Sequence, residues 1–131
     1  MTTLETRVEA HPTVTVGSNI GGSPVARVED LPVDRGVAVL VGGHPVALFR
    51  LSDGAIFAVD HIEPFTHVPV LARGLIGSVG DTPTVSSPLH KQRFDLHSGR
   101  CLDDAAYAVG TWAVEIVEGD VMIGERRPPE S

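Results

Sequence analysis

Two short segments of the chain gather the side chains that could bind a metal. Residues 60–67 read DHIEPFTH, and residues 85–94 read VSSPLHKQRF. In the first segment Glu63 offers a carboxylate, a hard donor that suits Mg, Ca or Mn. In the second segment His90 offers an imidazole, and Ser87 offers a hydroxyl that is a poor ligand unless it is deprotonated. Neither segment contains a recognisable Ser-His-Asp arrangement, so we assign no catalytic residue.

The histidines and the single cysteine could instead form a mononuclear metal site, if folding brings three of them together. The spacing His90-x₆-His97-x₃-Cys101 crosses an expected turn and matches no zinc pattern of closely spaced Cys or His pairs. The other two candidates are His61 and His67. We expect Cys101 to be a small buried apolar side chain, since a lone cysteine cannot form an internal disulfide.

Length and charge limit the classes of protein to which this chain can belong. The chain has 131 residues, enough for one domain with a core that needs no disulfides. A net charge of −7 argues against a nucleic-acid partner, because phosphates would repel it. Residues 1–7 lack the apolar stretch of a signal peptide, and no run approaches the roughly 20 apolar residues that span a bilayer. We therefore expect a cytoplasmic protein with no membrane partner.

The first half of the chain has the pattern of a β-meander. Residues 37–41 and 46–51 are apolar runs joined by Gly42-Gly43, which predicts a hairpin. Residues 55–59 form the next expected strand. The Asp53-Gly54 pair before it suits the positive φ angles of a type I′ turn.

The second half continues the same pattern. Residues 66–81, with three spaced glycines, are expected to be a loop, and residues 84–86 a brief strand. Residues 112–117 alternate with period two, and a turn leads from them into residues 121–123 as a last hairpin. Many short strands and no helical periodicity predict an all-β fold, a small barrel or sandwich.

Composition also suggests where the domain begins and ends. Residues 1–23 are rich in small residues and are expected to be a flexible tail, in which residues 14–16 could pair as a short edge strand. Residues 24–125 form the expected domain. Residues 126–131 are expected to be a second tail, because two prolines oppose strand pairing.

From about residue 24 to residue 124 the chain resembles the small subunit of assimilatory NAD(P)H-dependent nitrite reductase, a family with a Rieske-like fold. SPLHKQRF and SGRCLD are the specific parts of this resemblance, and the strand segments add weaker support. The matching segments are residues 36–41, 46–50, 57–60, 87–94 and 98–103. The resemblance implies a barrel or sandwich base with a smaller subdomain that carries the two loops.

In a Rieske domain the first loop carries Cys-x-His and the second carries Cys-x-x-His, and these four side chains hold a [2Fe–2S] cluster. The matching positions of this chain are Glu63, Phe65, Ser87 and His90. Phe65 has no donor atom, and one imidazole cannot hold a cluster. We therefore expect a degenerate site without iron and no other metal on this chain.

Apolar residues in the two loops could fill the space that a cluster would occupy, and an exposed apolar tip often marks a partner surface. Simple packing between the loops is the alternative. The candidates for partner contact are Pro64, Phe65, Pro88, Leu89, His90, Lys91 and Arg93.

The resemblance also implies a function in nitrate assimilation. The complex would reduce nitrite to ammonium. Its large subunit would carry FAD, an iron–sulfur cluster and sirohaem, and would use NAD(P)H. This chain would support that subunit without transferring electrons. Two alternatives remain open: a free-standing Rieske-like binding or regulatory module, and a redox ferredoxin with unusual ligands.

Overall fold

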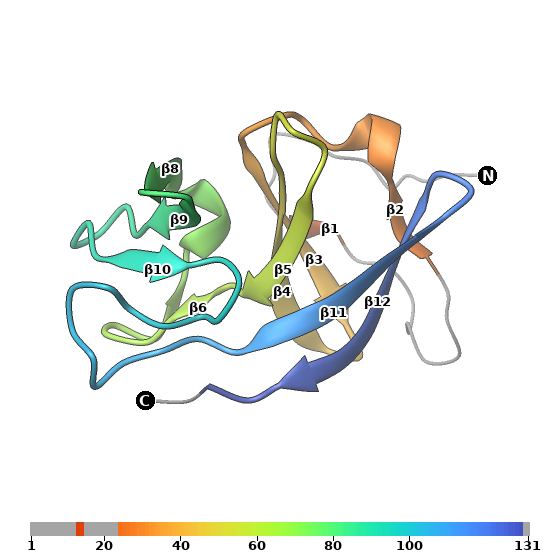
Figure 1. Ribbon diagram of the computed structural model, residues 1–131. Helices are drawn as coiled ribbons and strands as arrows, with labels where there is room; N and C mark the ends of the chain where they lie inside the picture. Colours follow the sequence, from red (N-terminus) through yellow and green to blue (C-terminus); the bar gives the residue numbers. More distant parts are fainter. Residues whose placement is uncertain (1–12, 15–23, 130–131) are drawn as a thin grey trace.

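Short strands joined by turns form most of the molecule (Figure 1). The computed structural model describes residues 13–14 and 24–129. Within these ranges seven strands form one curved sheet in the order β1-β3-β4-β5-β11-β12-β2. They are β1 (Thr13–Val14), β2 (Pro24–Arg27), β3 (Gly36–Val41), β4 (His44–Arg50), β5 (Ile56–Asp60), β11 (Thr111–Val117) and β12 (Asp120–Arg127). Among these seven described strands only β1 and β3 pair in parallel, and the predicted meander of three strands is present as β3, β4 and β5.

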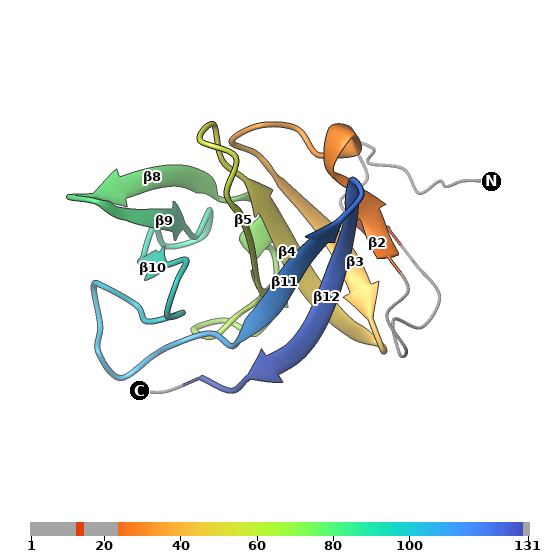
Figure 2. The ribbon, with the colours of Figure 1, turned by 45° about the vertical axis from the view of Figure 1, so that its right-hand side comes forward.

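Two smaller sheets lie at one end of this base (Figure 2). The three-stranded sheet has the order β10-β9-β8 and consists of β8 (Leu75–Val79), β9 (Thr82–Ser86) and β10 (Arg93–Asp95). The two-stranded sheet pairs β6 (Ile62–Glu63) with β7 (Val68–Pro69). The described residues also form two 3₁₀ turns, η1 (Val28–Asp30) and η2 (Leu71–Arg73). Among the described residues no helix is long and apolar enough to span a membrane.

Strand β4 is buried on both faces and separates two apolar clusters. Val46 and Leu48 point into the first cluster, inside the curved base, with residues from β2, β3 and β12. Ala47 and Phe49 point into the second cluster, which also contains Val85 of β9. The second cluster therefore holds the small three-stranded sheet against the base, as expected when consecutive strand residues face opposite sides.

Two details of the meander and its continuation differ from prediction. The turn at Asp53-Gly54 is not type I′, because only Gly54 has a positive φ, at 96°. Residues 66–81, predicted to be a loop, contain β7, η2 and β8. Of the three glycines that suggested a loop, Gly74 separates η2 from β8, Gly77 is paired within β8, and Gly80 lies in the turn between β8 and β9.

The ends of the chain differ from the predicted domain limits by a few residues. Strand β12 continues through Arg127, so Arg126 and Arg127, assigned to a tail, pair with Trp112 and Thr111. Thr13–Val14 pair with Ala38 and Val39, close to the edge strand expected at residues 14–16. The rest of the expected N-terminal tail and residues 130–131 lie outside the described residues.

Candidate functional site

The buried side chain of Glu63 holds the backbone of the first loop together. Its side chain is fully buried, and its two carboxylate oxygens accept three hydrogen bonds from the next residues of the loop. The Phe65 N–H donates to Oε2 at 2.9 Å, and the Thr66 N–H and hydroxyl donate to Oε1 at 3.0 and 2.6 Å. The His67 N–H then donates to the Glu63 carbonyl at 2.7 Å. The carboxylate is thus committed to the loop backbone.

Phe65 joins the two loops through aromatic contacts. Its ring lies 6.4 Å from Phe94, at the end of the second loop, and 4.0 Å from Tyr107, measured between ring centroids. Phe65 also packs against the second apolar cluster. We expected Pro64, Phe65, Pro88 and Leu89 to form an apolar plug, but the ring contacts of Phe65 are with Phe94 and Tyr107. Pro88 and Leu89 are exposed. Tyr107 is absent from the predicted set because it lies more than ten residues beyond the second loop.

Ser87 holds the second loop as Glu63 holds the first. The serine is 1% exposed, and its hydroxyl accepts the Leu89 N–H at 3.2 Å. Its backbone pairs with Gln92 and Lys91, at 2.8 and 2.9 Å, and Lys91 adopts a positive φ of 64°. Such a hydroxyl-to-backbone bond is a common way to close a tight turn. The loop presents its central residues to solvent: Pro88, Leu89, His90 and Lys91 are exposed.

Arg93 is paired with Asp103, an acidic residue ten positions further along the chain. Its guanidinium forms a two-pronged ion pair with Asp103, at 2.8 and 3.2 Å, and the Arg93 N–H donates to the same carboxylate. This pairing holds the pKa of Asp103 below its usual range. Of the candidates for partner contact, Lys91 therefore carries a charge that no ion pair neutralises among the described residues.

The histidines are separated in the structure. His61 is buried, and its Nδ1 accepts the Ala72 N–H at 3.0 Å, while His67, His90 and His97 are exposed. Burial, with a smaller contribution from the positive charge of Arg73, lowers the pKa of His61 from 6.5 to about 4. Within the described part of the chain no three His, Cys, Asp or Glu side chains come close enough to hold a metal ion. Burial raises the pKa of the Cys101 thiol, in keeping with its expected place in the core.

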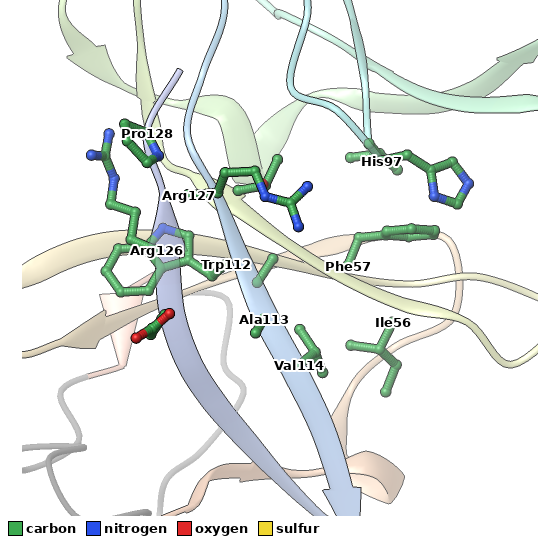
Figure 3. Close-up of a pocket in the computed structure, with 13 residues that line it drawn as sticks. Ile56, Phe57, His97, Trp112, Ala113, Val114, Arg126, Arg127 and Pro128 are labelled. Carbon is green, nitrogen blue, oxygen red and sulfur yellow. The ribbon is translucent and has the colours of Figure 1, made fainter. Parts of the chain in front are cut away.

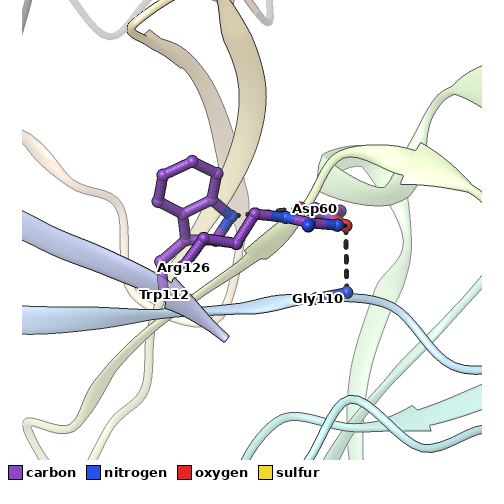
Figure 4. A network of polar contacts seen from close by, with 4 residues as sticks. All are labelled: Asp60, Gly110, Trp112 and Arg126. Carbon is purple, nitrogen blue, oxygen red and sulfur yellow. Dashed lines mark hydrogen bonds and ion pairs between the residues drawn. The ribbon is translucent and has the colours of Figure 1, made fainter. Parts of the chain in front are cut away.

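Asp60, at the start of the first loop, connects that loop to the base (Figure 4). One carboxylate oxygen accepts the Trp112 indole N–H and the Arg126 Nε–H, both at 3.1 Å. The other accepts the Gly110 N–H at 2.9 Å and an Arg126 Nη2–H at 2.6 Å. Burial acts to raise the pKa of Asp60, but these hydrogen bonds outweigh it and hold the pKa below its ordinary value.

An open groove of about 490 Å³ lies beside this network (Figure 3). It is found where β5 and β11 diverge after pairing at only two positions. Its walls come from β5, β11, β12 and the turn after β10, and they include Phe57, His97, Trp112 and Arg127. No residue of either loop lines it, so the groove is separate from the candidate site.

The two loops do not fit an iron–sulfur cluster. A [2Fe–2S] centre needs four thiolate or imidazole ligands. Phe65 has no donor atom, the Glu63 carboxylate already accepts three hydrogen bonds, and the buried Ser87 hydroxyl accepts another. His90 alone cannot hold the cluster. The arrangement instead offers two closed loops, the second of which has exposed side chains.

A curved all-β base with two loops on a small second sheet defines a Rieske-like domain. The family model of the Rieske-like [2Fe-2S] domain matches residues 23–124. The nitrite reductase (NADH) small subunit of Salmonella typhimurium strain LT2 is 36% identical over 100 residues, which cover 76% of this chain and 93% of that subunit. The chain therefore belongs to the family of nitrite reductase (NADH) small subunits, within the Rieske-like class.

Two further comparisons agree with this assignment. The crystal structure of a putative NADH-dependent nitrite reductase small subunit from Mycobacterium tuberculosis has a TM-score of 0.76 and 36% identity, and the match covers 83% of this chain and 96% of that one. The nitrite reductase [NAD(P)H] large subunit of Klebsiella oxytoca is 37% identical over 103 residues. That match covers 79% of this chain but only 11% of the large subunit.

Proposed function

We propose that this chain is the small, non-redox subunit of an NAD(P)H-dependent nitrite reductase and that its two-loop tip contacts the large subunit. The observation that carries the proposal is the closure of both loops by Glu63 and Ser87, at positions where a Rieske domain has cluster ligands. The loops keep a defined shape without iron. A defined shape without a redox centre suits a contact surface better than an electron carrier.

The match to the Klebsiella protein supports a large-subunit partner. About a tenth of that large subunit is similar to most of this chain, so a domain of this kind occurs within a nitrite reductase large polypeptide. A separate chain with the same fold would take the place of that domain by binding to the large subunit. The redox groups would then belong to the large subunit: FAD, sirohaem and an iron–sulfur cluster, with NAD(P)H as the electron donor.

Exposure of the tip supports its role in contact. Leu89 is 45% exposed at the end of the second loop, between Pro88 and His90, with Lys91 next in the chain. Phe65 supports this surface from the first loop through its contact with Phe94, and the Arg93–Asp103 ion pair fixes the far end of the surface. An apolar side chain ringed by polar ones is the usual composition of a contact centre.

Co-expression with the cognate large subunit tests the proposal. The two chains should co-purify, and the complex should oxidise NAD(P)H with nitrite faster than the large subunit alone. Leu89→Asp should weaken the complex by about tenfold or more, because it places a charge at the contact centre. Ile116→Asp is the matched control, since Ile116 is 46% exposed on the distant β11–β12 hairpin.

Two results would count against the proposal. If the chains do not associate, or if nitrite-dependent oxidation is indifferent to this chain, a free-standing binding module becomes the better description. If protein purified without oxygen contains stoichiometric iron and labile sulfide, the chain is a ferredoxin with unusual ligands.

A further inference from the structure

Strand β8 forms the outer edge of the three-stranded sheet and is unusually apolar for such a position (Figure 2). Leu75 is 76% exposed, the highest value for a large apolar side chain in the described part of the chain, and Val79 is 41% exposed. No described strand pairs with this edge. Residues 74–80 contain no charge and no proline, the features by which proteins normally protect an exposed edge.

The register with β9 shows which backbone groups of β8 are free. Pro83 lies opposite Ser78, and the Pro83 carbonyl accepts the Leu96 N–H at 3.0 Å on the other side of β9. Since Pro83 also has no N–H, Ser78 belongs to a non-hydrogen-bonded pair with it. The N–H and C=O of Ser78 therefore point to the open edge, and so do those of Ile76, two residues earlier.

We propose that two copies of this chain associate through β8 in an antiparallel, two-fold symmetric pair centred on Gly77. In this register Ile76 of one copy exchanges both backbone hydrogen bonds with Ser78 of the other, and the symmetry doubles the exchange. Leu75 then lies across from Val79 of the second copy on one face. Gly77 meets its own counterpart at the close, non-hydrogen-bonded position, where the absence of a side chain avoids a clash.

The charges that flank β8 favour a second copy over another partner. Arg73 precedes the strand and Asp81 follows it, both exposed and without an ion pair among the described residues. Antiparallel pairing about Gly77 places Arg73 of each copy next to Asp81 of the other. The edge is thus complementary to itself in hydrogen bonding, apolar contact and charge, as an isologous interface requires. Five residues per strand bury little area, so the dimer is a weak and reversible one.

Sedimentation velocity and amide exchange of the full chain test this association. The apparent mass should rise with concentration from 13.8 kDa toward twice that value. At high concentration the amides of Ile76 and Ser78 should exchange more slowly, whereas those of Leu75 and Gly77, already bonded to β9, should not change. Leu75→Lys should weaken the dimer by about tenfold or more, because each substitution acts twice in a symmetric pair. Ile116→Lys should leave it intact.

Charge exchange provides the sharpest test. Arg73→Glu and Asp81→Arg should each weaken self-association, because each sets like charges opposite one another. An equimolar mixture of the two variants should associate again, since both contacts between unlike copies then join opposite charges. A chain that stays monomeric at every concentration would overturn the proposal. So would a mixture that associates no better than its components, or a Leu75→Lys variant that dimerises normally but loses the large subunit. That last result would assign β8 to the large subunit.

Discussion

Glu63 occupies a position where a Rieske loop carries a cluster ligand. Its carboxylate organises the loop, as a cluster would, but does so through hydrogen bonds. A cluster organises its loops because four protein ligands converge on it. A carboxylate has two oxygens that can together accept about four hydrogen bonds, so one side chain can organise several backbone groups. Glu63 accepts three, and Ser87 provides a smaller version on the second loop. Each loop is thus closed within itself, and Phe65 connects the two.

His61, at the entrance of the first loop, should make the stability of the fold depend on pH. Its pKa is about 4 in the folded chain and 6.5 when unfolded, so the unfolded state binds the proton first as pH falls. The free energy of unfolding should therefore be fully retained above pH 6.5 and decline between pH 6.5 and about 4. Urea unfolding at a series of pH values measures this slope.

Two substitutions distinguish the contribution of His61 to this pH dependence from the contributions of other histidines. His61→Asn keeps an acceptor for the Ala72 N–H but cannot take up a proton, so the decline in this pH range should flatten. His90→Asn removes an exposed imidazole and should preserve the slope. If the dependence of the unfolding free energy on pH is the same in His61→Asn, the folded chain takes up a proton at His61 as readily as the unfolded chain does.

At the scale of elements, the sequence predicts strands whose signals lie in neighbouring residues. It does not predict strands or side-chain pairs that depend on segments distant in the sequence. The apolar runs and turn glycines of residues 36–50 were sufficient to predict β3 and β4, because both signals lie within or directly between the two strands. Strand β8 was missed because Gly74 and Gly77 resemble loop residues unless their neighbour β9 is known. The same holds at the site. The positions of Glu63 and Ser87 follow from the resemblance, but the pairing of Arg93 with Asp103 depends on folding that brings the two segments together.

Gly74 should prove essential to the β8–β9 hairpin, whereas Gly77 should not. A Cβ at Gly74 would overlap the Ser86 carbonyl oxygen of β9, and the backbone there cannot easily move. A Cβ at Gly77 would find Thr84 Oγ1 at 3.5 Å, an ordinary contact. Gly74→Ala should therefore lower the free energy of unfolding by about 1–3 kcal/mol, and Gly77→Ala by less than about 0.5 kcal/mol. Denaturant midpoints for the two variants measure the difference, and equal values would mean that the hairpin tolerates strand separation at Gly74.

At the scale of the whole molecule, the Asp60 network ties the loop end to the base. Asp60, the last residue of β5, is hydrogen-bonded to the start of β11 and to the end of β12. These three segments are far apart in the sequence. The groove of Figure 3 opens at the other end of the β5–β11 pairing, where the two strands separate after two positions. At Asp60 the backbone pairing persists, because the Asp60 N–H donates to the Gly110 carbonyl at 2.9 Å, and the network adds side-chain hydrogen bonds to it. Arg126, which we expected to lie in a tail, is therefore bonded to the base.

Truncation tests this limit of the domain. A chain ending at Arg127 keeps the network and should unfold within about 0.5 kcal/mol of the full chain. A chain ending at Glu125 loses the Arg126 guanidinium, which leaves Asp60 half-buried without its cation, and also loses the pairing with Thr111 and Trp112. We expect it to be less stable by about 2–4 kcal/mol, of which Arg126→Ala in the full chain should reproduce the larger part. Urea unfolding of the four chains gives the comparison. If the chain ending at Glu125 is as stable as the full chain, residues 126–131 are a dispensable tail and the Asp60 network contributes nothing to holding the loops on the base.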